Sequence, residues 1–235
     1  TIKRVTLERG GKSASVVFAD ADIEKAAAAA PSAVFGNAGQ DCCARSRILV
    51  ESSQVDNVLA AMETAVKSIR VGDPLDASTE MGPLISASHR EKVGSFVTGE
   101  GAVAFRGSAP DGPGYWFPPT VLAPMSNTDR AAREEIFGPV ACVIPFDGEE
   151  EAIRIANDTE YGLSGSIWTR DGGRALRVAR AIDTGVLSIN SNSSVRVSTP
   201  FGGFKQSGIG RELGPDALDH YTEVKNVFYS TEVDD

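Results

Sequence analysis

The sequence predicts an α/β protein with a mainly parallel sheet and helices on both faces. Short runs rich in β-branched residues alternate with amphipathic helical segments, the pattern of a parallel sheet covered by crossover helices. The 235 residues suffice for one sizeable core, and neither an internal repeat nor a low-complexity linker divides them. Strands are expected at 13–18, 47–51, 102–105, 140–145, 165–169, 185–190 and 222–229.

The first predicted helix follows the first strand. Asp20 or Asp22 can accept a hydrogen bond from a free amide at the start of this helix, and an alanine-rich run then continues toward Phe35. Pro31 lies inside the run and lacks the amide hydrogen that a helix interior requires. We therefore expect Pro31 to interrupt the helix, either by a kink or by a new start.

The second predicted helix has the clearest periodicity. Apolar side chains recur at helical spacing over 55–69, and Ser52 or Ser53 is available to cap the helix. A Gly-Asp-Pro turn at 72–74 is expected to end it. Further helices are predicted at 88–97, 149–157 and 174–182.

Composition and charge exclude several classes of partner. Hydrophobic residues make up 41% and charged residues 23% of the chain, as in an ordinary globular protein. A net charge of −9 without a Lys/Arg cluster argues against a nucleic-acid partner. Because no apolar run approaches the roughly 20 residues that span a bilayer, no membrane association is expected. The chain starts at Thr1 rather than Met, which reads as a cut end or a processing site.

The cysteines and histidines indicate the compartment and argue against a metal site. Cys42, Cys43 and Cys142 cannot all pair internally, and adjacent cysteines rarely bridge each other. Free thiols predict a reducing compartment, the cytoplasm. Cys142 falls in an apolar strand and is assigned to the core. His89 and His220 are too few and too isolated to build a metal centre, so none is expected.

Two short segments hold a carboxylate and a thiol 34 residues apart. The segment 5–12 contains Glu8 followed by two glycines, and the segment 35–47 contains Cys42 in a Gly-Gln-Asp-Cys-Cys run. A cysteine thiolate can attack an aldehyde carbonyl, and a nearby carboxylate can deprotonate the water that releases the acyl group. Taken alone, Cys42 could instead be a small buried residue, and Glu8 a surface glutamate.

The two segments, in this order and at this distance, resemble the signatures of the NAD(P)-dependent aldehyde dehydrogenase superfamily. The resemblance implies that Cys42 attacks the aldehyde to give a thiohemiacetal, that hydride passes to NAD or NADP, and that Glu8 activates the water that hydrolyses the thioester. It assigns one oxyanion donor to the backbone N–H of Cys42 and the other to an asparagine outside this sequence. Relatives that transfer the acyl group to coenzyme A generally lack the glutamate, so Glu8 favours a carboxylic acid as product. Arg9 departs from the family, which usually has a small or apolar residue there.

Two later segments resemble further signatures of the same superfamily. In the segment 134–140, the resemblance makes Glu135 a contact of the nicotinamide ribose and Phe137 a contact of the nicotinamide ring. In the segment 199–208, it places Phe201 at the substrate entrance. A long loop rich in Ser, Gly and Pro inside a compact domain is usually functional or disordered, and the resemblance favours function.

Residues that flank the nucleophile line the substrate tunnel in this superfamily, so the candidates are Asp41, Cys43, Val195, Arg196 and Phe201. The Gly-Gln-Asp-Cys run resembles enzymes that act on amino aldehydes such as 4-aminobutanal, because the Asp41 carboxylate could pair with a substrate ammonium group. The same carboxylate would raise the pKa of the thiol by like-charge repulsion, and Arg196 could neutralise it. An aminobutyraldehyde dehydrogenase is therefore one alternative within the family.

The resemblance covers essentially the whole chain and matches the catalytic-domain type of the superfamily. It implies that 1–10 are the tail of a missing cofactor-binding domain, that 11–207 are the catalytic domain, and that 208–235 carry a strand that pairs with another subunit of a homodimer or homotetramer. Three functions remain open: an aldehyde dehydrogenase, a truncated cofactor-free relative with a structural or interaction role, and a thiol esterase. Because the chain supplies only one wall of the cofactor site, it is expected to have little or no dehydrogenase activity in isolation.

Overall fold

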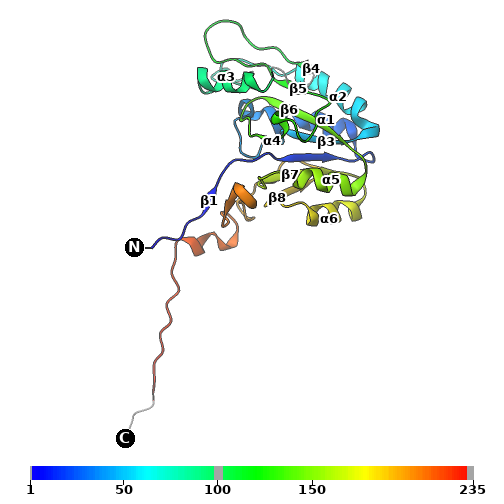
Figure 1. The fold of residues 1–235 in the computed structure, drawn as a ribbon. Helices are drawn as coiled ribbons and strands as arrows, with labels where there is room; N and C mark the ends of the chain where they lie inside the picture. The colour runs from blue at the N-terminus through cyan, green and yellow to red at the C-terminus, as the bar shows by residue number, and fades with distance from the viewer. Residues whose placement is uncertain (1, 98–102, 232–235) are drawn as a thin grey trace.

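A seven-stranded sheet forms the centre of the computed structural model, which describes residues 2–97 and 103–231 (Figure 1). Every neighbouring pair of strands is parallel except β4 and β5, so the predicted mainly parallel sheet is confirmed. In spatial order the strands are β4 (Val103–Arg106), β5 (Thr120–Leu122), β6 (Val140–Phe146), β3 (Arg47–Glu51), β2 (Ala14–Val17), β7 (Ser164–Trp168) and β8 (Val186–Ile189). Residue 102 of the strand predicted at 102–105 lies outside the described residues.

The helices cover both faces of this sheet. α1 (Ile23–Phe35) and α2 (Val55–Lys67) lead the chain from β2 toward the β4 edge, whereas α5 (Gly148–Asn157) and α6 (Gly172–Ala181) lead it back toward β8. Since crossovers between parallel strands are right-handed, the two directions place the two helix pairs on opposite faces. Within each pair the helices contact each other. In the part of the chain that the structure describes, no helix is long and apolar enough to cross a membrane.

The remaining elements are short. A two-stranded antiparallel ladder joins the beginning of the chain to its last quarter, and several single turns of helix lie in the connections. These elements are β1 (Leu7–Glu8), β9 (Gly208–Ile209), α3 (Ala87–Ser95), α4 (Arg130–Arg133) and the 3₁₀ segments Gly36–Gly39, Ser52–Gln54, Lys205–Ser207 and Pro215–His220.

Two expectations about helix termini are settled by the hydrogen bonds. Asp22 caps α1, since its carboxylate accepts a hydrogen bond from the backbone N–H of Lys25 at 3.1 Å. The cap predicted at Ser52 or Ser53 is wrong: Gln54 occupies the cap position of α2 without a side-chain bond. Ser52 instead donates its hydroxyl to the carbonyl of Phe146 at 3.1 Å, which ties the end of β3 to β6.

Two predicted features of the chain are absent from the described residues. α1 runs as one helix through Pro31, so the predicted new start is wrong, whereas the kink stays a prediction; Pro31 is buried, and its apolar contacts offset the lost hydrogen bond. The strand predicted at 222–229 forms no ladder, and the segment extends away from the sheet with Val224 98% and Phe228 86% exposed (Figure 1). The Arg4 side chain bonds to Thr222 and Glu223 at the start of the segment, but no described segment forms a backbone ladder with it, and a strand requires such a partner.

Two buried cations lie beneath the amino ends of the central strands. The guanidinium group of Arg47 donates to the carbonyls of Lys12, Ile155 and Ala156, each at 2.9 Å, and to the side chain of Asn127. The ammonium group of Lys12 is buried and has no hydrogen-bond partner among the described residues. Burial lowers the pKa of Lys12 from 10.5 to about 8. A polar cavity of about 20 Å³ adjoins it, enough for about one water molecule.

Replacing this buried ammonium should stabilise the protein in a pH-dependent way. In the unfolded chain Lys12 keeps its proton up to its ordinary pKa of 10.5, whereas in the folded chain it loses the proton near pH 8. Stability therefore rises with pH between those values, by about 3 kcal/mol at 1.36 kcal/mol per pKa unit. We expect Lys12→Met to be more stable than the parent protein below pH 8, with this advantage shrinking toward pH 10.5.

The measurement is the free energy of unfolding by urea at several pH values between 7 and 10.5 for both proteins. Lys92→Met, at an exposed position of α3, serves as the matched control and should show no such dependence. A constant difference between Lys12→Met and the parent across this range would contradict the prediction.

Candidate active site

The candidate residues meet at one edge of the sheet. Cys42 precedes β3, and Glu135 and Phe137 precede β6. Glu8 lies in β1, which precedes β2. Because β2, β3 and β6 are parallel neighbours, the segments that enter these strands share the edge formed by the strands' amino ends.

Cys42 lies in a tight turn after the end of α1. Asn37, Ala38 and Gly39 have positive φ angles of 51°, 56° and 69°, which terminates the helical run. The carbonyl of Asp41 accepts a hydrogen bond from the N–H of Ala44 at 3.0 Å and closes the turn. The turn leaves the thiol of Cys42 partly exposed.

Glu8 is positioned by the β1–β9 ladder. It pairs with Gly208, and the next N–H along the chain, that of Arg9, donates to the carbonyl of Ser207 at 2.9 Å. The Glu8 side chain is exposed, and its Oε1 accepts a hydrogen bond from the Sγ of Cys42 at 3.7 Å. The structure thus brings together the thiol and the carboxylate that the sequence singled out.

Glu135 and Phe137 lie beside this pair. Oε1 of Glu135 accepts a hydrogen bond from the N–H of Gly11 at 2.9 Å. The ring of Phe137 is 38% exposed although its backbone has a φ of 56°, an unusual value for a residue with a side chain. Its carbonyl lies 2.6 Å from Nε2 of His89, and the two rings meet edge to face. No pattern in the sequence connects His89 with this segment.

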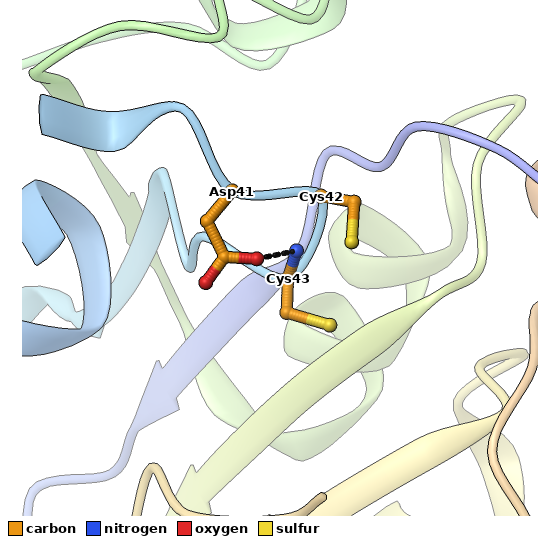
Figure 2. A group of neighbouring side chains, drawn as sticks. All are labelled: Asp41, Cys42 and Cys43. Atoms are coloured by element: carbon orange, nitrogen blue, oxygen red, sulfur yellow. Dashed lines mark hydrogen bonds between the residues drawn. The ribbon is translucent and has the colours of Figure 1, made fainter. Parts of the chain in front are cut away.

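The predicted substrate-lining residues occupy different environments. Cys43 and Phe201 are buried in one small apolar cluster, against which Cys42 packs. Asp41 is exposed, and its Oδ1 accepts a hydrogen bond from the N–H of Cys43 at 2.8 Å (Figure 2). Val195 is 47% exposed and lies outside the apolar cluster.

Two arginines near the turn have roles that the sequence did not reveal. Arg196 donates to the hydroxyl of Ser193 at 2.9 Å and to the carbonyl of Val195, so these hydrogen bonds do not neutralise the Asp41 carboxylate. Arg45 is buried; it donates to the carbonyl of Cys43 and to the hydroxyl of Ser194, each at 2.8 Å. It thereby ties the cysteine turn to the loop after β8. Arg45 lies three residues after Cys42 within the same signature, and this position in the sequence could have pointed to its role.

The two adjacent thiols affect each other's titration. The pKa of Cys42 is raised, first by the hydrogen bond that it shares with Cys43, then by burial and by nearby negative charge, including Asp41 and Glu8. The pKa of Cys43 is lowered, chiefly by the same hydrogen bond, which stabilises its thiolate. Arg45 also lowers it.

Comparison with known proteins decides the family. The model of the aldehyde dehydrogenase family matches residues 1–227. This chain belongs to the aldehyde dehydrogenase family. Geranial dehydrogenase of Castellaniella defragrans is 43% identical over 97% of the chain, and betaine aldehyde dehydrogenase of Bacillus subtilis is 44% identical over 98%. The matches cover 48% and 49% of those proteins, so the chain spans about half the length of the curated relatives it matches.

Solved structures of this family share the fold. Betaine aldehyde dehydrogenase of Staphylococcus aureus in complex with NAD⁺ superposes with a TM-score of 0.87 at 43% identity, covering 93% of this chain and 45% of that one. NAD-dependent aldehyde dehydrogenase of Sinorhizobium meliloti superposes with a TM-score of 0.90 at 40% identity, covering 97% and 46%. The α/β fold with a mainly parallel sheet is therefore that of the aldehyde dehydrogenases.

Removing Cys43 should make Cys42 easier to deprotonate. The hydrogen bond with Cys43 is the largest cause of the raised pKa of Cys42, so Cys43→Ala should lower that pKa. Iodoacetamide alkylates the thiolate, and peptide mass spectrometry measures the rate at Cys42. As the pH is raised, we expect this rate to increase at a lower pH in the variant than in the parent protein.

Cys142→Ala is the matched control, because Cys142 is buried in β6, away from this turn. It should leave the pH profile of Cys42 unchanged. If the pH profile of Cys42 alkylation in Cys43→Ala is unchanged or shifted to higher pH, Cys43 does not raise the pKa of Cys42.

Proposed function

We propose that this chain is the catalytic half of an enzyme that oxidises an aldehyde to a carboxylic acid with NAD or NADP. The observation that carries the proposal is the contact between the thiol of Cys42 and the carboxylate of Glu8, 3.7 Å apart and both reachable from solvent, in a chain of this family. A nucleophile and a base within reach of one carbonyl are what thioester formation and hydrolysis require.

The chain's own residues account for both acyl-transfer steps. The Cys42 thiol loses its proton to solvent as its sulfur bonds to the carbonyl carbon of the aldehyde, and the oxygen takes up the resulting negative charge beside the backbone N–H of Cys42. After oxidation the carbon is held as a thioester. Glu8 then accepts a proton from a water molecule as that water attacks the thioester, and the carbon–sulfur bond breaks to release the carboxylic acid and the Cys42 thiolate.

Glu135 and Phe137 fit the predicted nicotinamide cofactor, which would supply the hydride acceptor. Gly10 has no side chain where it meets the carboxylate of Glu135, and the N–H of Gly11 fixes that carboxylate at the edge of the site. A carboxylate held in this way can accept hydrogen bonds from ribose hydroxyls. The exposed ring of Phe137 can pack against a flat heterocycle. The complex of the S. aureus relative with NAD⁺ supports this assignment.

The substrate class that we propose is an aldehyde with a cationic group. The Asp41 carboxylate is exposed beside the nucleophile, and Arg196 forms its recorded bonds elsewhere. Betaine aldehyde, named for several relatives, carries a quaternary ammonium, whereas geranial, named for another, is apolar. Comparing kcat/KM for 4-aminobutanal and hexanal in a protein that contains both halves decides between these classes; equal values would reject the cationic preference.

Two further assignments are proposals of the same kind. The extended segment 222–229 is proposed to pair with another copy of the chain in a homodimer or homotetramer, because its apolar side chains are exposed. A cytoplasmic location is proposed because all three cysteines are free thiols.

Acyl transfer by the isolated chain is the direct test of Cys42 and Glu8. With 4-nitrophenyl acetate, which acylates a thiol without a cofactor, we expect a burst of nitrophenol followed by slow turnover. Cys42→Ala should abolish the burst. Glu8→Gln should keep the burst and slow the turnover by about 10²–10⁴-fold, because only hydrolysis of the thioester needs the base.

Cys142→Ala controls for the loss of a thiol and should retain both phases. A burst that survives Cys42→Ala would reject the proposed nucleophile. In a protein that contains both halves, formation of NADH or NADPH that depends on aldehyde separates a dehydrogenase from a thiol esterase. The absence of any acylation would favour a structural or interaction role.

A further inference from the structure

The turn that holds the nucleophile also gathers three ligand groups of the kind that thiophilic metal ions bind. The sulfur atoms of Cys42 and Cys43 and a carboxylate oxygen of Asp41 all lie within 4.8 Å of one another. Figure 2 shows the two thiols projecting to one side of the turn and the Asp41 carboxylate on the other side, hydrogen-bonded to the backbone N–H of Cys43. Within the described ranges 2–97 and 103–231, this is the group of such side chains close enough to hold one ion.

We propose that Asp41, Cys42 and Cys43 bind a thiophilic divalent cation, Zn²⁺ in the cell, and that this binding reversibly masks the nucleophile. Each thiol releases one proton to solvent when its sulfur bonds to the metal, and the ionised carboxylate contributes its negative charge without protonation change. No oxidant or reductant is needed. The metal binding stands on the geometry alone, whereas its consequence as an inhibitor rests on the proposed function.

The distances suit a small ion after modest side-chain rotation. Zn²⁺ lies about 2.3 Å from thiolate sulfur and about 2.0–2.2 Å from carboxylate oxygen, which puts the ligand atoms of a tetrahedral site roughly 3.5–3.8 Å apart. The ligand atoms, which lie up to 4.8 Å apart, must therefore approach one another by about 1 Å. Rotation about the side-chain bonds of Asp41 and Cys42, which are not fully buried, can supply this movement.

The surroundings favour a cation at this position. The Oδ1 atom of Asp41 is held by the N–H of Cys43, so the carboxylate is already oriented, and a carboxylate has further lone pairs to offer a metal. Glu8 adds a second negative charge beside Cys42, and its Oε1, 3.7 Å from the sulfur, is placed to become a fourth ligand. Two thiolates with carboxylate oxygens select Zn²⁺ or Cd²⁺ over Mg²⁺ and Ca²⁺, which prefer oxygen ligands alone.

Titration of the reduced chain with Cd²⁺ in chelator-free buffer tests the site without reference to enzyme activity. Cd²⁺ bound to thiolates absorbs in the ultraviolet, and we expect saturation at one ion with the release of two protons. Competition by Zn²⁺ should abolish this absorption, whereas Mg²⁺ should not. Cys43→Ala should weaken binding by more than about 100-fold, since loss of a ligand costs at least as much as loss of its supporting contacts.

Two variants separate a chelate from binding at one thiol. Asp41→Asn keeps the hydrogen bond to the N–H of Cys43 but removes the charge, and should weaken binding by about tenfold or more. Cys142→Ala should leave binding unchanged, because Cys142 is fully buried elsewhere. Equal affinity in the parent and in Cys43→Ala would overturn the proposal.

Masking of the nucleophile has its own readout. Bound Zn²⁺ should protect Cys42 from iodoacetamide, and a chelator should restore the alkylation. Alkylation that proceeds at the same rate with saturating Zn²⁺ would overturn the masking. If Cd²⁺ binds as expected while 4-nitrophenyl acetate is not turned over, the metal site stands and the proposed function fails instead.

Discussion

Backbone packing through glycine is the constraint on which the whole site depends. A Cβ atom on Gly11 would lie 2.6 Å from the carbonyl oxygen of Cys42, and one on Gly39 would lie 2.2 Å from that of Gly138. Contacts this short exclude any side chain, so the three segments that enter β2, β3 and β6 can meet only where glycine allows it. The close approach brings Glu8 and Glu135 to the thiol. Without these glycines the same strands could form, but the groups would stand apart.

The site lies at the opposite edge from the one that open α/β sheets usually employ. Ligands of such folds commonly bind beyond the carboxyl ends of the strands, where helix amino termini point. Here the side chains at the carboxyl edge bond to one another. Asp20 accepts hydrogen bonds from Thr169 and Arg170 and forms an ion pair with Arg174. At the amino edge, the cations Lys12 and Arg47 are buried below the surface, whereas Glu8, Arg9 and Asp41 are exposed.

Local patterns sufficed for most of the sheet and for the chemistry, but not for contacts between distant segments. The strands and helices follow from apolar periodicity, and the pairing of Cys42 with Glu8 followed from two recognisable signatures. The β1–β9 ladder has two residues on each side and leaves no periodic trace, although it places Glu8. Pro31 does not start a new helix, because burial in the core outweighs one lost hydrogen bond. The segment 222–229 has strand composition, but composition cannot supply a partner for it.

The contact between thiol and carboxylate also orders the two proposed half-reactions. Before reaction, the Sγ of Cys42 donates its hydrogen to Glu8, so the carboxylate holds the thiol in place. The thiol proton must leave before the sulfur bonds to carbon, and it passes to solvent, which reaches the exposed Glu8. A thioester has no S–H group, so the ionised carboxylate can then accept a hydrogen bond, and next a proton, from the attacking water. The same position of Glu8 thus serves both half-reactions, first beside the thiol and then beside the water, without movement of the fold.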